Sequence, residues 1–177
     1  MTDGKEYGKA LFMLTEECGT TERVVEDVKV ARSAFLENSD YVRLLDTPVL
    51  PKNERVALAD KAFLSLDENL VNLIKILAEA HNTHAFIKAA DEYLSLYDDS
   101  RGILRVEAIS AIALTHEQSA ALAKKLEGQL HKTVIIKNVV DPAILGGMKL
   151  RYGDRQLDGS VKTRLDKFEE ALKNTIV

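Results

Sequence analysis

The chain has one cysteine, Cys18, among 177 residues, so no disulfide can form within it. A single cysteine also excludes zinc modules that need several cysteine ligands, and it suits a reducing compartment. No uncharged apolar run approaches the roughly 18 residues of a membrane-spanning helix, and the first residues lack a secretory pattern. Since 46% of the residues are apolar, we expect a soluble protein with a real core rather than a disordered chain.

An excess of basic residues is also missing. The formal net charge is −4 and the pI is about 5.6, whereas a protein that neutralises nucleic-acid phosphates needs an excess of Lys and Arg. We therefore expect no nucleic-acid partner and no direct insertion into a membrane. The charge is unevenly spread, because residues 1–100 carry 11 basic against 19 acidic side chains and residues 101–177 carry 13 against 9. This division suggests two domains with different partners.

The chain lacks the motifs of common catalytic and cofactor sites. It contains no G-x-S-x-G and no H-E-x-x-H, and Gly146-Gly147 precede a strand pattern instead of the helix that follows a phosphate-binding loop. His81 and His84 have no third metal ligand close in sequence, so we interpret them as surface histidines. We expect no catalytic residue, no cofactor and no metal, and we interpret Cys18 as a small core residue.

Residues 4–98 show helical periodicity. Apolar residues recur three and four positions apart, as in helices that bury one face. Pro48 ends the third segment, Pro51 fits the opening turn of the fourth, and Asp67 caps the fifth. The predicted helices span about 7–18, 21–37, 40–45, 51–64, 67–78 and 83–97. Their short connections predict a six-helix bundle over residues 1–102.

The periodicity changes from helical to alternating near Gly102, and alternation of apolar and polar residues is typical of a half-buried strand. The predicted elements are a strand at 104–114, a helix from Thr115 to about 130, strands at 133–140 and 148–152, and a final helix. This order predicts a small α/β domain over residues 103–177. The predicted fold class is therefore α+β with two domains, an N-terminal six-helix bundle followed by a small C-terminal α/β domain.

Between residues 141 and 168 the chain concentrates turn residues, and Gly146-Gly147 permit a positive φ where the chain reverses. An unusual spacing runs through this stretch: Asp141, Pro142, Ile144, Gly146, Gly147, Met148, Leu150, Gly153, Asp154, Leu157, Asp158, Gly159, Ser160, Val161 and Leu165. It resembles the C-terminal signature of the delta subunit of F-type ATP synthase, whose mitochondrial counterpart is the oligomycin-sensitivity-conferring protein. The opening YGKALF also resembles that family's Tyr-Ala-x-Ala-Leu start. Gly8 replaces the usual Ala, and Gln156 stands where an apolar residue is common.

The resemblance implies a non-catalytic subunit of the peripheral stalk, or stator. Such a subunit links the soluble catalytic head to the membrane sector, on the cytoplasmic face of a bacterial cell membrane, and supports proton-coupled ATP synthesis. By the same resemblance, the first and fifth helices receive the N-terminal helix of an alpha subunit. The expected contact residues there are Tyr7, Leu11, Leu14, Leu70, Leu73, Ile74 and Leu77.

The resemblance also implies that the α/β half receives the b subunits of the stalk, with the beta subunit as a further candidate partner. The expected contact residues are Arg151, Arg155, Lys162, Arg164 and Phe168. Three alternatives stay open. Residues of the apolar stripes either contact a partner or build the bundle core. The last helix either packs on the sheet or offers its face to a partner. The whole chain is either a stalk subunit or an adaptor module that binds other helices.

Overall fold

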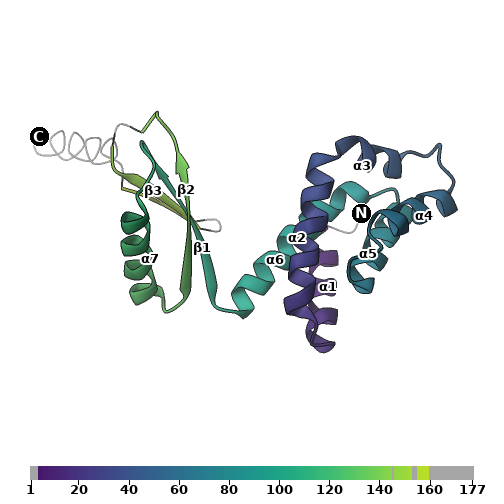
Figure 1. The fold of residues 1–177 in the computed structure, drawn as a ribbon, viewed down its shortest axis with the longest axis horizontal. Helices are drawn as coiled ribbons and strands as arrows, with labels where there is room; N and C mark the ends of the chain where they lie inside the picture. The colour runs from purple at the N-terminus through teal and green to yellow at the C-terminus, as the bar shows by residue number, and fades with distance from the viewer. Residues whose placement is uncertain (1–3, 145, 153–154, 160–177) are drawn as a thin grey trace, which may run out of the picture. The chain divides into compact units, whose positions relative to one another are not determined.

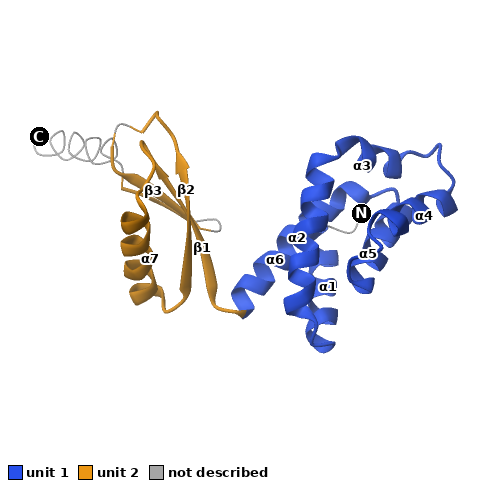
Figure 2. Ribbon diagram, in the orientation of Figure 1, with its two compact units in different colours: residues 1–100 blue, residues 101–177 orange. Residues whose placement is uncertain are grey.

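The computed structural model describes residues 4–144, 146–152 and 155–159. The chain divides into two compact units, residues 1–100 and residues 101–177 (Figure 2). The described part of the first unit is helical, and the second combines a helix with a mixed sheet (Figure 1). The α+β class predicted from the sequence is confirmed.

The elements of the first unit follow the predicted order. They are α1 (Gly4–Glu17), α2 (Thr21–Glu37), α3 (Ser39–Asp46), α4 (Lys52–Ala62), α5 (Glu68–Glu79), the short 3-10 helix η1 (Thr83–Ala85) and α6 (Phe86–Ser100). The predicted sixth helix began at Thr83, but residues Thr83–Ala85 form the 3-10 turn and the α-helix starts one turn later. Such turns are common at the start of α-helices.

Aromatic side chains join the helices of the first unit in its core. Phe35 of α2 packs on Phe86 of α6, with ring centroids 4.5 Å apart, and on Phe63 at a centroid distance of 5.6 Å. Tyr93 of α6 has no exposed surface, and Tyr97 lies partly buried against the same core. The aliphatic stripes of α2 and α5 complete this core, because Val24, Val28, Leu70, Ile74 and Leu77 have no exposed surface.

In the second unit, four strands form one mixed sheet in the order β2-β1-β3-β4. The elements are β1 (Ile103–Ser110), α7 (His116–Leu130), β2 (Thr133–Val140), β3 (Met148–Tyr152) and β4 (Arg155–Asp158). β1 pairs parallel with β2 and antiparallel with β3, and β3 pairs antiparallel with β4. The parallel pair requires a crossover, which α7 supplies.

Local side-chain bonds define the ends of α7. The Thr115 side chain accepts a hydrogen bond from the N–H of Gln118, whose side chain accepts one from the N–H of Thr115. This capping box confirms the predicted N-cap. At the other end, Glu127 accepts a hydrogen bond of 3.0 Å from the N–H of Val134 at the start of β2, so the helix is tied to the strand that follows it.

The predicted strand at 104–114 is too long, since β1 ends at Ser110. Beyond that point, side-chain hydrogen bonds take the place of the backbone hydrogen bonds between strands. The Ser110 hydroxyl donates to the carbonyl of Ile112, and the Asn138 side chain accepts from the N–H of Leu114. Ile112, an apolar residue inside the predicted strand, is 77% exposed. β4 was not predicted, and Gly147 takes the positive φ that the sequence predicted, at 79°.

Candidate functional site

A groove of about 300 Å³ lies between α1 and α5. The residues that line it are Tyr7, Ala10, Leu11 and Leu14 from α1, and Asn69, Asn72, Leu73 and Ile76 from α5. None of these lining side chains is charged, and two of them, Asn69 and Asn72, carry an amide group. An apolar trough with a few amides suits the apolar face of an amphipathic helix.

Two large apolar side chains stand at the rim of the groove. Leu14 is 42% exposed and Ile76 is 52% exposed, whereas Leu11 and Leu73 are nearly buried and form the floor. Fully burying a leucine or isoleucine side chain contributes about 1.5–3 kcal/mol. A partner that covered these two rim residues would therefore gain part of that energy from each without disturbing the floor.

The α5 wall of the groove is fixed at both ends. At its start, the Asp67 side chain accepts from the N–H of Asn69 at 3.0 Å, and Asp67 donates its own N–H to Asp27 of α2 at 2.8 Å. At its end, the buried Arg55 guanidinium donates to the carbonyl of Ala78 at 3.0 Å. A cation at a helix C-terminus also opposes the negative end of the helix dipole.

The α1 wall is held by packing on α6. The Phe12 ring meets the Tyr93 ring edge-on at a centroid distance of 5.7 Å. Behind it, the hydroxyls of Thr15 and Tyr93 lie 3.0 Å apart in a fully buried hydrogen bond. A tyrosine hydroxyl is protonated at neutral pH and able to donate, and burial raises the pKa of the Tyr93 hydroxyl further.

Of the residues predicted for this site, Tyr7, Leu11, Leu14 and Leu73 line the groove. Leu70, Ile74 and Leu77 lie together in the core with no exposed surface. Four further residues line the groove and were not predicted: Ala10, Asn69, Asn72 and Ile76. Positions 69, 72 and 76 share one face of α5 with Leu73, because 69 and 76 are four and three residues from Leu73 and 72 is three residues from 69. Spacing alone does not show that this part of the face is left uncovered.

The second predicted surface is only partly described. Arg151 on β3 is exposed and pairs with Glu107 on β1, its cross-strand neighbour. Arg155 belongs to β4, where its backbone pairs with Tyr152. Lys162, Arg164 and Phe168 lie outside the described residues.

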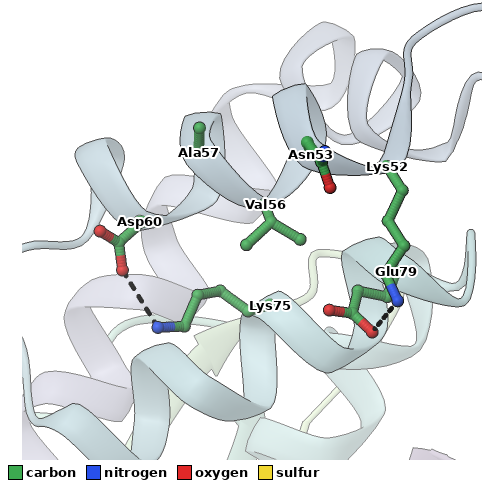
Figure 3. A pocket seen from close by; sticks show the side chains of 7 residues that line it. All are labelled: Lys52, Asn53, Val56, Ala57, Asp60, Lys75 and Glu79. Atoms are coloured by element: carbon green, nitrogen blue, oxygen red, sulfur yellow. Dashed lines mark hydrogen bonds and ion pairs between the residues drawn. The ribbon is translucent and has the colours of Figure 1, made fainter.

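A further pocket of about 360 Å³ lies between α4 and α5 (Figure 3). An ion pair stands at each end: Lys52 lies 2.9 Å from Glu79, and Lys75 lies 3.1 Å from Asp60. Val56 points between the two pairs (Figure 3). Because the charged side chains lining this pocket neutralise one another, it presents no excess charge to a ligand.

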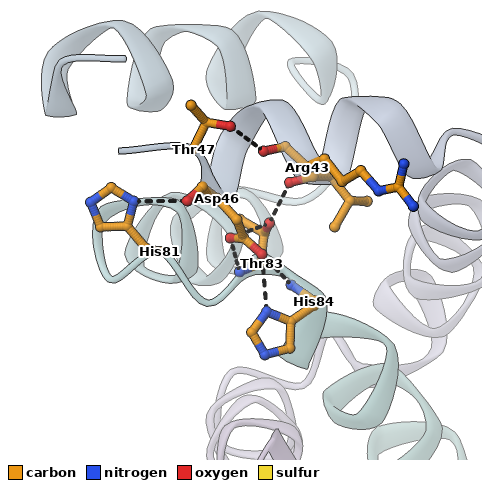
Figure 4. Close-up of polar contacts among 7 residues, drawn as sticks. Arg43, Asp46, Thr47, His81, Thr83 and His84 are labelled. Atoms are coloured by element: carbon orange, nitrogen blue, oxygen red, sulfur yellow. Dashed lines mark hydrogen bonds and ion pairs between the residues drawn. The ribbon is translucent and has the colours of Figure 1, made fainter. Parts of the chain in front are cut away.

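Asp46, at the end of α3, ties that helix to the start of η1 (Figure 4). Its carboxylate accepts from the N–H and the hydroxyl of Thr83, each at 2.7 Å, and lies 2.9 Å from Nδ1 of His84. Burial alone would raise the pKa of Asp46, but the hydrogen bonds from Thr83 and His84 outweigh it and lower that pKa. This carboxylate holds the turn between α5 and α6 in place.

Other chemistry-bearing residues do not form a site in the part of the chain that the structure describes. No cluster of three or more His, Cys, Asp or Glu side chains suited to a metal ion occurs among those residues. Cys18 is exposed, so its interpretation as a core residue is wrong. It follows the last residue of α1, where the chain leaves the helix and the apolar stripe no longer faces the core. No described helix has the length and apolarity to cross a bilayer.

Comparison with known proteins identifies the family that the chain resembles. The family model for the ATP synthase delta (OSCP) subunit matches residues 4–172. ATP synthase subunit delta of Geobacillus sp. (strain WCH70) is 31% identical over 169 residues, which cover 95% of this chain and 95% of the relative. ATP synthase subunit delta of Clostridioides difficile (strain 630) is 33% identical, over 96% of this chain and 95% of the relative.

A solved structure shares the fold. A chain in the cryo-EM structure of the Toxoplasma gondii mitochondrial ATP synthase hexamer superposes with a TM-score of 0.78 at 20% sequence identity. The match covers 97% of this chain and 98% of that one. At this identity the likeness shows that the arrangement of helices and strands is common to both.

Proposed function

Because the chain belongs to the ATP synthase delta (OSCP) subunit family, it is a peripheral-stalk subunit of the F-type ATP synthase, and we propose that the α1/α5 groove is its attachment to the catalytic head. The occupant is the N-terminal helix of an alpha subunit. The six-helix bundle acts as the receiving domain, and the apolar lining of the groove, with Leu14 and Ile76 half exposed at its rim, carries the proposal.

The second unit provides the other attachment of this subunit, which is to the stalk itself. The b subunits dock on the α/β domain, where Arg151 and Arg155 belong to adjacent strands, and family resemblance adds Lys162, Arg164 and Phe168 as contact residues. The beta subunit is a further candidate contact. The chain itself catalyses no reaction and holds no cofactor, and it works at the cytoplasmic face of a bacterial cell membrane, as the bacterial sources of its relatives suggest.

Such a link must withstand torque without a covalent bond. A nanomolar complex requires about 12 kcal/mol, and an amphipathic helix reaches this only when several apolar anchors are buried in the groove. The floor residues Leu11 and Leu73 supply shape, and the rim residues Leu14 and Ile76 supply surface still available for burial.

The groove is tested by calorimetry with the full-length protein and a synthetic peptide of the alpha subunit's N-terminus. The Leu14→Gln, Ile76→Gln double variant should bind roughly 10- to 100-fold more weakly, since each half-exposed anchor contributes about 0.7–1.4 kcal/mol. Val30→Gln is the matched control, because Val30 is 59% exposed on α2 and does not line the groove. Equal binding by the double variant and the control would refute the groove as the docking site.

The coupling role is tested in membranes stripped of their soluble head. Adding back the head together with this protein should restore ATPase activity that depends on proton flow, and the head alone should not restore it. Co-purification of the chain with ATP synthase subunits separates this function from that of a general helix-binding adaptor.

A further inference from the structure

A row of residues runs along α1 at the edge of the groove: Glu6, Ala10, Met13 and Glu17. Each is three or four positions from the next, so their side chains lie on one face of the helix. Ala10 itself lines the groove, and every residue of the row is exposed. Because the row contains two glutamates and no basic residue, the outer edge of the α1 wall is acidic.

The α5 wall has an edge row at the same spacing: Glu68, Asn72, Lys75 and Glu79. Asn72 lines the groove, and Glu68 is exposed one turn before it. Lys75 and Glu79 form ion pairs with residues of α4, at 3.1 and 2.9 Å, so their charges are compensated within the first unit. The negative charge of Glu68 is therefore the one left over on this edge.

The three edge glutamates, Glu6, Glu17 and Glu68, form no ion pair with any residue that the structure describes. The lysines of α1 do not reach them, because Lys5 and Lys9 lie 3.8 and 3.9 Å from Glu92, on the α6 side of the helix. An uncharged groove floor is thus flanked by carboxylates that lack a cation from the described part of the chain. A partner with positive charge beside its apolar surface would supply one.

We infer that the groove selects a basic amphipathic helix, one that carries Lys or Arg on the flanks of its apolar stripe to face the three edge glutamates. This inference rests on the proposed attachment to the catalytic head and specifies the chemistry of the alpha-subunit helix. Exposed ion pairs add little affinity, whereas complementary charges speed association and disfavour helices with acidic flanks. The apolar contacts hold the helix, and the edge glutamates decide which helix enters.

The test measures association rates by stopped flow, with the full-length protein and the synthetic peptide of the alpha subunit's N-terminus. The triple variant Glu6→Gln, Glu17→Gln, Glu68→Gln should associate roughly ten-fold more slowly than the wild type at about 50 mM salt. At about 500 mM salt the two rates should agree within roughly two-fold, because the screening length falls from about 14 Å to about 4 Å.

The matched control is the triple variant Glu16→Gln, Glu37→Gln, Glu54→Gln, which removes three exposed glutamates of the same unit that belong to neither edge row. Glu54 matches Glu68, because each lies in the first turn of its helix. The control has the same net charge as the test variant, so it separates the position of the charges from their number. It should associate within roughly two-fold of the wild type at both salt concentrations.

A second peptide, in which every Lys and Arg of the alpha-subunit peptide is replaced by Gln, provides an independent readout. The wild type should bind it more weakly than the parent peptide at low salt, and the test variant should bind both peptides equally. Wild-type association by the test variant, or an alpha-subunit helix without Lys or Arg beside its apolar stripe, would overturn the inference and leave the groove assignment standing. A wild-type protein that binds neither peptide would instead overturn the proposed attachment, and the inference with it.

Discussion

Gly8 of α1 lies directly against the backbone carbonyl of Ala89 in α6. A methyl group added at Gly8 would collide with that carbonyl oxygen and would stand 2.9 Å from Cβ of Glu92. Gly4, one turn earlier, lies equally close to η1 and α6, because a methyl group there would stand 2.7 Å from the carbonyl oxygen of Ala85 and 2.8 Å from Cβ of Lys88. The glycines therefore allow α1 to approach α6 closely, and this approach positions the α1 wall of the groove.

Gly8→Ala should destabilise the protein even though alanine favours helices by about 1 kcal/mol over glycine. The added methyl group has to push two backbones apart, and overpacking of this kind costs about 1–3 kcal/mol. Gly128→Ala is the control, since Gly128 lies in α7 with no atom within 4 Å of the added group. Urea titration should show a lower midpoint for Gly8→Ala and an equal or higher one for Gly128→Ala. A stabilised Gly8→Ala protein would contradict the close approach.

Some of this architecture was predictable because it depends on local chemistry. Thr115 followed three residues later by Gln118 predicts the start of α7, and the structure has the capping box there. β4 was missed because four residues, Arg-Gln-Leu-Asp, are too short and too polar to show alternation. Its pairing with β3 is a long-range property that no local pattern reports.

The groove was harder to predict than the helices around it. Leu73 and Ile74 are neighbours in one apolar run, yet Leu73 lines the groove and Ile74 is sealed in the core. Periodicity shows that α5 has an apolar face but not which neighbouring helix covers each part of it. Ile76, the most exposed large side chain of the groove, lay outside the predicted set for this reason.

The buried hydroxyl pair of Thr15 and Tyr93 should contribute to the stability of the α1 wall. Tyr93→Phe removes one partner and leaves the Thr15 hydroxyl its bond of 3.0 Å to the carbonyl of Phe12. Loss of such a hydrogen bond costs about 0.5–1.5 kcal/mol. Thr15→Val should cost more, because the Tyr93 hydroxyl would keep only a contact of 3.5 Å to the carbonyl of Thr21. Denaturant titration of both variants checks this order, and a neutral Thr15→Val would contradict it.

The tie made by Asp46 predicts a pH dependence with a definite sign. Its folded pKa is lowered by the hydrogen bonds from Thr83 and His84, against the effect of burial. A carboxyl group with a depressed folded pKa stabilises the protein above its unfolded pKa of about 4, and this stabilisation is lost as the pH falls through the folded value. Asp46→Asn should therefore be less stable than the wild type at pH 7, and the difference should shrink towards pH 3.

Thermal melts at several pH values measure this difference. Asp40→Asn is the control on the same helix, because the Asp40 side chain is 96% exposed and pairs only loosely, at 3.7 Å, with Arg43. A gap between wild type and Asp46→Asn that stays constant from pH 7 to pH 3 would show that the charge of Asp46 is not what stabilises the turn.

Arg55 should matter more to stability than any of the ion pairs around the α4/α5 pocket. Its side chain is 3% exposed and donates to the carbonyls of Leu50 at 2.6 Å and of Ala78 at 3.0 Å. Arg55→Met keeps much of the volume but removes the guanidinium from both carbonyls. The carbonyl of Ala78 keeps the N–H of His81 at 3.4 Å, whereas a buried group left unsatisfied costs about 1–3 kcal/mol. Lys52→Met breaks only the exposed pair with Glu79, a kind of pair that contributes about 0–1 kcal/mol.

Because Arg55 binds the end of α5, Arg55→Met should also weaken binding of the alpha-subunit peptide, and Lys52→Met should not. Equal stability of the two variants would show that water replaces the guanidinium at the carbonyls.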